Sequence, residues 1–277
     1  MNNGINVLSL FDGISCGQIA LERAGIKVNQ YFASEIDKHA IKVTQYNYPD
    51  TIQLGSVVDV KAKKLPKIEI LMGGSPCQGF SFMGKQLNFN DPRSKLFFEF
   101  VRLIKECKPK YFLLENVKMK KEFENIITNS LGVTPIKINS SLVSAHLRSR
   151  YYWTNIPDIS IPQDKNIKLN DILEFGASER KKSVTLLASY GDKIANEAGV
   201  RHYKTRSVGQ LIPDDTSNCG YRKLTVKEAS RLQTIPDSYL QIEEISDKEK
   251  YRQLGNGWTV DVIAHIFSFL PEEFKNG

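Results

Sequence analysis

The sequence holds little that could build a metal cluster or a disulfide framework. Its 277 residues include four cysteines and four histidines. The cysteines (Cys16, Cys77, Cys107 and Cys219) form no Cys-x-x-Cys pair, and the histidines are scattered along the chain. This pattern disfavours a zinc site or a set of disulfides and favours a reducing compartment. We therefore expect no bound metal.

Long hydrophobic runs are also missing. No apolar run approaches the roughly 18 residues that a membrane-spanning helix needs. Residues 5–11 form a strand-like run near the N-terminus, without the basic start that is typical of a signal peptide. The sequence has no internal repeat and no low-complexity segment. These features predict a cytoplasmic protein without a membrane partner, built from one large domain or from one large and one small domain.

Positive charge is present and unevenly distributed. The formal net charge is +7, and the segment from Arg180 to Arg231 contains eleven Lys and Arg against five Asp and Glu. A basic block beside a nearly neutral remainder favours contact with a polyanion such as nucleic acid. A solvated basic surface without a partner is the alternative interpretation.

The first half of the chain alternates apolar runs with helical segments. The apolar runs lie at residues 5–11, 30–34, 51–54, 68–72 and 111–114. Residues 94–107 carry apolar side chains at helical spacing. Continuous apolar strands separated by helices are typical of a parallel sheet that is covered on both faces. The sequence therefore predicts an α/β fold with a doubly wound, mostly parallel sheet.

The pattern weakens after residue 153. Residues 157–221 are polar, basic and interspersed with glycine, and they show no long helical period. A helix is predicted from Thr225, whose spacing to Glu228 fits a capping box, and another at residues 260–270. We expect this last helix to pack on the first domain. The predicted division is a first domain of residues 1–156, completed by 250–277, and a small irregular domain of residues 157–249.

Polar and glycine residues follow each predicted strand, at the sheet edge where open α/β folds bind ligands. Glu35 follows the second strand and lies 22 residues after Gly13. That spacing suits a carboxylate that binds the ribose of an adenosine-containing cofactor. A helix cap or ordinary surface-loop chemistry is the alternative interpretation.

A tight turn at residues 73–81 holds one thiol. Its sequence is Gly-Gly-Ser-Pro-Cys-Gln-Gly-Phe-Ser, directly after the apolar run 68–72. A cysteine in such a turn can act as a nucleophile, whereas a free cysteine is often only a small buried hydrophobe. The turn alone leaves both interpretations of Cys77 open.

Taken together, these residues resemble the cytosine-C5 DNA methyltransferases, which transfer a methyl group from S-adenosylmethionine to DNA. The resemblance covers nearly the whole chain in order. The matching segments are Phe11-Asp12-Gly13, Glu35, Pro76-Cys77-Gln78, Glu115-Asn116-Val117, Arg148-Ser149-Arg150, Arg222-Lys223-Leu224-Thr225, Arg231-Leu232-Gln233 and Gly255-Asn256-Gly257. The resemblance implies a Rossmann-like methyltransferase domain, with the small irregular domain serving target recognition.

The resemblance also implies a covalent mechanism. C5 of cytosine is a weak nucleophile until a thiolate adds at C6, and the resemblance makes Cys77 that thiolate. The resemblance then places Glu115 at the N3 and amino edge of the cytosine. To reach this site, the cytosine must be flipped out of the duplex. Arg150 becomes the partner for charge at the base carbonyl, supported by Arg148. A surface ion pair is the alternative role for each arginine.

The implied cofactor is S-adenosyl-L-methionine, and the implied partner is double-stranded DNA, bound by a monomer. The implied cofactor contacts are Phe11, Asp12, Gly13, Ile14, Glu35, Ile36, Val57, Pro76, Asn256 and Trp258. The implied DNA contacts are Gln78, Ser81, Lys85, Arg93, Thr185, Arg206 and Arg222. Residues 81–94 are predicted to form a lid over the flipped base.

The chain departs from the family pattern at three positions. Ser56 stands where an acidic residue is usual, with Asp59 as the nearest substitute. His146 replaces a glutamine, and we expect a structural role for it. Trp258 replaces a smaller residue, and we expect it to pack on the cofactor. The short recognition region indicates a small target sequence or a reduced interface.

Two other functions stay open at this point. An RNA cytosine-C5 methyltransferase of the same fold is compatible with a short recognition region. A catalytically idle DNA-binding regulator is the other alternative, although the presence of both Cys77 and Glu115 argues against it.

Overall fold

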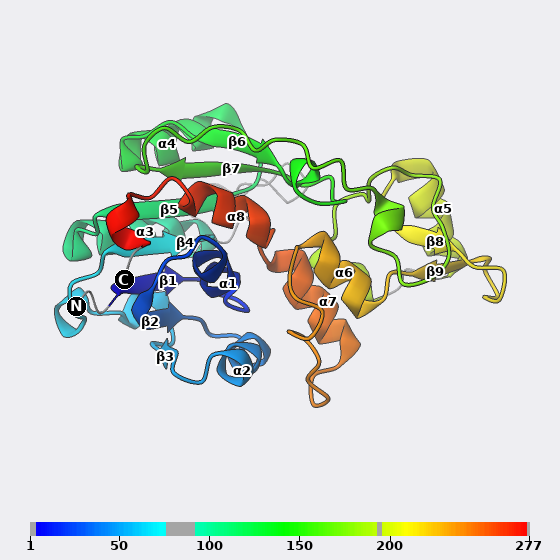
Figure 1. Ribbon diagram of the computed structural model, residues 1–277, viewed down its shortest axis with the longest axis horizontal. Coiled ribbons are helices and arrows are strands. Elements are labelled where there is room, and N and C mark those ends of the chain that lie inside the picture. The colour runs from blue at the N-terminus through cyan, green and yellow to red at the C-terminus, as the bar shows by residue number, and fades with distance from the viewer. Residues whose placement is uncertain (1–3, 76–91, 193–195, 276–277) are drawn as a thin grey trace. The chain divides into compact units, whose positions relative to one another are not determined.

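The computed structural model describes residues 4–75, 92–192 and 196–275 (Figure 1). The chain divides into two compact units. Unit 1 comprises Met1–Ile138, Ser149–Ser160 and Ala264–Gly277, and unit 2 comprises Asn139–Arg148 and Ile161–Ile263. The functional division into a catalytic domain (1–156 with 250–277) and a target-recognition domain (157–249) stays a prediction.

Unit 1 is built on a seven-stranded sheet with the strand order β3-β2-β1-β4-β5-β7-β6. The strands are β1 (Ile5–Leu10), β2 (Val28–Ser34), β3 (Ile52–Gln53), β4 (Ile70–Gly73), β5 (Tyr111–Asn116), β6 (Ile136–Asn139) and β7 (Ser149–Thr154). Strands β1 to β5 pair in parallel, and β7 pairs antiparallel with β5. The order runs outward in both directions from the β1–β4 pair, so the predicted doubly wound, mostly parallel sheet is confirmed.

Four helices accompany these strands: α1 (Cys16–Arg23), α2 (Lys38–Asn47), α3 (Pro92–Cys107) and α4 (Lys121–Leu131). The predicted helix at 94–107 corresponds to α3, which begins at Pro92 because proline is well suited to a first helical turn. The third strand is shorter than predicted, since only Ile52 and Gln53 pair with β2. A short 3-10 turn, η1 (Val57–Asp59), follows it, and a second, η2 (Ala62–Lys64), comes next.

One apolar core of unit 1 lies between the sheet and α3. Leu10, Leu71 and Leu114 on neighbouring strands are fully buried in one apolar cluster with Phe97 and Phe100 of α3. The strands are apolar on successive residues because both faces of a parallel sheet are covered. This core fixes the carboxyl ends of β1, β4 and β5, where the polar residues singled out from the sequence begin.

Unit 2 contains little regular structure. Its elements are the antiparallel pair β8 (Leu211–Pro213) and β9 (Tyr221–Lys223), the helices α5 (Glu197–Arg206), α6 (Val226–Leu232) and α7 (Asp247–Asn256), and the 3-10 turns η3 (Ser140–Leu142), η4 (Leu169–Asp171) and η5 (Ala188–Gly191). Helix α8 (Val260–Phe267) spans the junction with unit 1, and η6 (Glu272–Phe274) follows it.

The helix predicted from Thr225 is confirmed as α6. The Thr225 hydroxyl accepts a hydrogen bond from the Glu228 amide (3.1 Å), and the Glu228 carboxylate accepts one from the Thr225 amide (2.8 Å). Within residues 157–221, where the sequence shows no long helical period, the structure contains a helix that was not predicted, α5. In that helix only Tyr203 is buried, so it lacks the apolar period by which a helix is detected in sequence.

Within the described ranges, no helix has the length and apolar character required to cross a membrane. The same residues contain no group of three or more His, Cys, Asp or Glu side chains placed to hold a metal ion.

Candidate active site

The loop between β1 and α1 is tightly wound. Phe11, Gly13 and Ser15 all have left-handed backbone angles, with φ values of 56°, 59° and 53°. Such angles cost free energy for residues other than glycine, and they cluster at ligand-binding sites. The first loop therefore carries the strain that is common where a backbone is shaped around a ligand.

Asp12 anchors this loop from inside. Its carboxylate accepts hydrogen bonds from the hydroxyls of Tyr31 (2.7 Å), Ser15 and Ser9. Burial raises the pKa of Asp12 to about 6, although these hydroxyls oppose the rise by stabilising the charged form. The carboxylate of Asp12 thus serves the conformation of the loop, at an electrostatic cost.

Glu35 joins the first loop to the end of β2. One carboxylate oxygen, Oε2, accepts from the Gly13 amide (2.8 Å), and Oε1 accepts from the amides of Ile36 (2.7 Å) and Asp37 (2.8 Å). A carboxylate offers about four acceptor positions, so these three bonds orient the group and leave capacity for one further donor. This is the geometry required of a fixed carboxylate that accepts from a ligand hydroxyl.

A cavity of about 200 Å³ opens beside Glu35. It is lined by Phe11, Ser34, Glu35, Ile36, Gly55, Ser56, Val57 and Leu96. Four predicted cofactor contacts therefore meet here. Apolar walls with a few fixed polar groups are typical of a small-molecule pocket, and this one suits the flat base and the hydroxyls of a nucleoside.

Asp12, Gly13 and Ile14, which are also predicted to contact the cofactor, are not among the residues that line this cavity. The Gly13 amide is bound to Glu35, and Ile14 is buried. Ser56 lines the cavity where the family pattern has an acidic residue. Asp59 is exposed on η1 and is not among the lining residues, so the structure offers no support for it as a substitute.

Glu115 and Arg150 form an ion pair at the end of β5. Arg150 Nε lies 2.9 Å from Glu115 Oε1, and both side chains are mostly buried. The pairing of Glu115 with Tyr152 puts Arg150, two residues earlier in β7, diagonally opposite on the same face of the sheet. The antiparallel register therefore creates this contact, and the guanidinium holds the carboxylate in one orientation.

The ends of β4 and β5 are tied together next to this pair. The Asn116 side-chain amide donates to the hydroxyl (3.1 Å) and the carbonyl (3.4 Å) of Ser75, and all of these atoms are buried. Ser75 comes two residues before Cys77 in the sequence. The chain therefore enters the predicted catalytic turn from a fixed point beside Glu115.

Arg148 belongs to unit 2 and has a different environment from Arg150. Its buried guanidinium donates to the carbonyls of Gly255 (3.2 Å), Gly257 (3.0 Å) and Leu186 (3.5 Å). A cation at the last carbonyls of a helix is electrostatically favoured, so Arg148 stabilises the end of α7. Its predicted supporting role in catalysis stays a prediction.

The Gly255-Asn256-Gly257 segment is shaped by close packing in unit 2. A Cβ on Gly255 would lie 2.4 Å from backbone atoms of Leu187 and Ala188, so only glycine fits. Next to it, Asn256 is exposed and Trp258 is half-buried. Gln233, whose role the sequence did not reveal, donates from Nε2 to Leu254 O (2.7 Å) and Gly257 O (3.1 Å). The packing explains the glycine and the glutamine, and a cofactor role for Asn256 and Trp258 stays a prediction.

Comparison with known proteins identifies the family. A family model described as C-5 cytosine-specific DNA methylase matches residues 5–163 and 120–271. Type II methyltransferase M1.ScrFI of Lactococcus lactis subsp. cremoris is 32% identical over 304 residues, covering 94% of this chain and 76% of that protein. Type II methyltransferase M.SsoII of Shigella sonnei is 30% identical, covering 96% and 79%. The chain belongs to the C-5 cytosine-specific DNA methylases.

This methylase is therefore an enzyme that acts on C5 of cytosine in DNA. Its fold is also found in a solved structure, the Entamoeba histolytica methyltransferase EhMeth, with a TM-score of 0.78 and coverage of 99% of both chains. Sequence identity to that protein is 21%, so the likeness concerns the fold alone.

The predicted DNA contacts of the methylase in unit 2 differ in their environments. Arg206 is exposed at the end of α5, and the half-buried Thr185 donates to Leu147 O (2.6 Å). Arg222 forms two hydrogen bonds with Glu228 (2.8 and 3.0 Å), and its guanidinium lies 3.9 Å from the ring centroid of Phe175. The geometry of Arg222 therefore favours a structural role over contact with DNA.

His146 is fully buried, and its Nε2 accepts the Leu186 amide (2.8 Å), which is the structural role expected for it. The remaining predictions fall on Pro76, Cys77, Gln78, Ser81 and Lys85, which lie outside the described residues. The same holds for the side chain of Arg93 and for most of the predicted lid at 81–94. Their roles in the methylase stay predictions.

Proposed function

We propose that this methylase takes its methyl group from S-adenosyl-L-methionine and transfers it to a cytosine flipped out of a short, specific duplex sequence. The reaction passes through a covalent bond between Cys77 and C6 of the base. The observation that carries the proposal is the Glu115–Arg150 ion pair at the end of β5, where the next residue, Asn116, is hydrogen-bonded to Ser75, two residues before Cys77 in the sequence.

The cavity beside Glu35 fits the nucleoside part of the cofactor. Phe11, Val57 and Leu96 provide apolar walls for an adenine ring, and the remaining acceptor position of Glu35 suits a ribose hydroxyl. When bound, S-adenosyl-L-methionine supplies an electrophilic methyl group. Pro76, Asn256 and Trp258 are proposed to complete its contacts.

Cys77 activates the base in this mechanism. Its thiolate adds to C6, the electron pair of the C5–C6 bond then makes C5 nucleophilic, and after methylation C5 loses its proton while the thiolate leaves. A thiol with a pKa of about 8.5 is only a few per cent ionised at pH 7, a deficit of roughly 2 kcal/mol. A nearby cation or several backbone N–H groups would reduce this deficit.

Glu115 and Arg150 act on the same base. Arg150 holds Glu115 Oε1, so we assign Oε2 to the N3 edge of cytosine, where a protonated ring accepts the thiolate more readily. Arg150 also stabilises negative charge that develops near the base carbonyl. Mostly buried groups suit this task because they are preorganised and weakly screened by water.

Double-stranded DNA is the proposed partner, bound by a monomer. Exposed basic side chains of unit 2, Arg206 among them, are proposed to contact phosphates, and Thr185 is proposed to contact the target. Each phosphate contact that is lost should weaken binding to all sequences and reduce its dependence on salt.

The test uses the full chain, labelled S-adenosyl-L-methionine and two substrates, duplex DNA and tRNA. We expect label in DNA only. Duplex DNA with 5-fluorocytosine at target sites should trap a covalent complex, because C5 cannot then lose a proton. The complex should be absent in Cys77→Ser and present in Cys107→Ser, the matched control. Label confined to tRNA would refute DNA as the substrate, and a trapped complex in Cys77→Ser would refute the nucleophile.

A further inference from the structure

We propose that Arg102 is a positioning residue for the cofactor cavity. It fixes the segment of residues 55–60, here called the η1 loop, whose first three residues form one wall of that cavity. The inference rests on the proposed binding of S-adenosyl-L-methionine. Arg102 itself does not line the cavity, but it holds the wall formed by residues 55–57 in place.

Arg102 bridges α3 and the η1 loop. Its Nη2 donates to Val57 O (3.2 Å) and its Nη1 donates to Val60 O (3.2 Å), so one guanidinium holds the carbonyls at both ends of η1. Its Nε and Nη1 also donate to Glu99 (2.8 Å) and Glu106 (3.0 Å). The planar fork of arginine suits two acceptors at once, which a lysine cannot reproduce.

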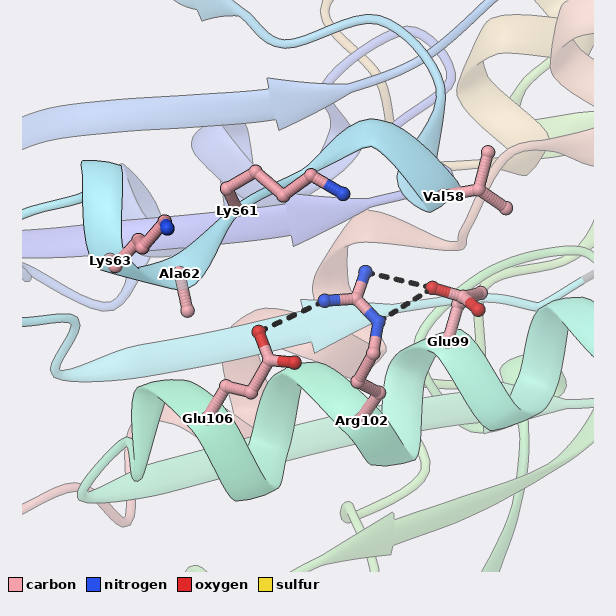
Figure 2. Close-up of a pocket in the computed structure, with 7 residues that line it drawn as sticks. All are labelled: Val58, Lys61, Ala62, Lys63, Glu99, Arg102 and Glu106. Carbon is pink, nitrogen blue, oxygen red and sulfur yellow. Dashed lines mark hydrogen bonds and ion pairs between the residues drawn. The ribbon is translucent and has the colours of Figure 1, made fainter.

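The two glutamates orient this fork. Glu99, Arg102 and Glu106 lie at positions i, i+3 and i+7 of α3 and therefore share one face of the helix. Figure 2 shows the guanidinium standing between the two carboxylates, beneath the segment that carries Val58 and Lys61. A cavity of about 600 Å³ lies here, separate from the one beside Glu35.

The η1 loop lies between these two cavities. Val57 and Val58 are neighbours in sequence, yet Val57 is buried and lines the cavity beside Glu35, whereas Val58 is exposed and lines the one beside Arg102. Leu96 of α3 lines the cavity beside Glu35 as well. Helix α3 therefore supplies part of the cavity wall directly and anchors another part through Arg102.

The sheet alone gives this loop little support. Strand β3 ends at Gln53, and the attachment closest to it is the bond from the Leu54 amide to Ala33 O (2.8 Å). At the next residue, the Ser34 hydroxyl donates to Gly55 O (2.8 Å). Arg102 adds the two attachments at residues 57 and 60, beyond the point where Gly55 turns with a φ of +72°. The position of Ser56 and Val57 thus depends on anchors at both of its ends.

Because residue 56 is a serine and not an acidic residue, cofactor binding depends more strongly on how Arg102 holds the η1 loop. Among the described residues that line the cavity, Glu35 is the one carboxylate. Asp59 of the η1 loop does not line the cavity, so the loop can offer an adenine ring its backbone groups, the Ser56 hydroxyl and the packing of Val57. Backbone groups act as recognition elements only when their positions are fixed, so cofactor affinity should depend on Arg102.

The test compares Arg102→Met, Arg102→Lys and Lys121→Met in the full chain. Lys121 is the matched control, because it is a helix-surface cation of unit 1 paired with Glu124 three residues away. We expect Arg102→Met to raise the KM for S-adenosyl-L-methionine about tenfold while kcat changes less than about twofold, since the lost interaction acts on binding. Arg102→Lys should recover part of the loss, and Lys121→Met should behave as the parent.

Hydrogen exchange in the ligand-free protein provides a readout that does not depend on activity. The Asp59 and Val60 amides bond to Ser56 O (3.0 Å) and Val57 O (3.4 Å) within the loop. In Arg102→Met these amides should exchange at least about tenfold faster, while amides of β1 stay unchanged. If Arg102→Met does not fold, the same amides are measured in Arg102→Lys, where a smaller increase in exchange rate is expected.

The outcomes separate this inference from the proposed function. If the parent protein fails to bind S-adenosyl-L-methionine, the proposed function and the proposed role of Arg102 are both refuted. If the parent binds it and Arg102→Met keeps an unchanged KM and unchanged exchange at Asp59 and Val60, the proposed function stands and the role of Arg102 is refuted. A change in kcat alone would also refute the role, because the cavity wall is assigned to binding.

Discussion

Replacing Asp12 by asparagine should stabilise this methylase at neutral and alkaline pH. The pKa of Asp12 is raised from 3.8 to about 6, so the folded protein holds the proton more tightly than the unfolded chain. Stability from this group is therefore complete below about pH 4 and is lost as the pH rises through 6. Asparagine lacks the charge and can still accept from Tyr31 and bond to Ser15.

The size of the expected change in the free energy of unfolding follows from the same pKa shift. A rise of the pKa from 3.8 to about 6 corresponds to about 3 kcal/mol against the ionised form in the folded state. Because the residue is partly exposed, solvent screening should reduce the measurable effect to about 1–2 kcal/mol. Asp12→Asn should therefore raise the free energy of unfolding by that amount at pH 8 and by nearly nothing at pH 4.

Urea denaturation at pH 4, 6 and 8 measures this difference. The exposed Asp50→Asn is the matched control, and its effect should not follow the same pH course. A destabilised Asp12→Asn at pH 8 would contradict the predicted gain, because the hydroxyl bonds would then outweigh desolvation. A gain that does not shrink between pH 8 and pH 4 would contradict it as well.

Three further predictions concern single side chains. Arg148→Met should destabilise the protein by about 2–4 kcal/mol in urea denaturation, because buried carbonyls lose a charged donor, and an effect below 0.5 kcal/mol would contradict the assignment. Arg150→Gln should lower kcat on DNA about a hundredfold with little change in the KM for the cofactor, and equal losses in both would instead indicate a general disturbance of the fold. Gly255→Ala should lower stability by about 1–3 kcal/mol or more in thermal unfolding, because its Cβ would meet the backbone at Ala188, and a neutral result would show that the packing relaxes there.

The central strands of the sheet were predictable because each is a short apolar run closed by polar or glycine residues. The two strands beyond β5, namely β7 and the edge strand β6, were not. Strands β6 and β7 carry charged residues such as Lys137 and Arg150, so they lack the continuous apolar character that marks β1 and β4. Helix α5 was missed for the related reason that one buried side chain, Tyr203, leaves no period to detect.

The site was predictable in its residue types and not in its geometry. Family resemblance singled out Glu115 and Arg150, yet their contact depends on the antiparallel register of β5 and β7, which no local pattern encodes. From the Arg-Ser-Arg motif, Arg148 and Arg150 were predicted to act together in the same site. The boundary between the units falls directly after Arg148, so the two guanidinium groups serve different units.

The way the chain divides between the two units limits how this enzyme can be recombined with its relatives. Unit 2 is discontinuous in sequence and consists of residues 139–148 and 161–263. The chain returns to unit 1 at residue 264. A cassette exchange of residues 161–263 alone would leave Arg148 behind and present it with foreign carbonyls in place of Gly255 and Gly257. Chimaeras that exchange unit 2 should therefore carry both segments, with junctions at the four crossings between the units.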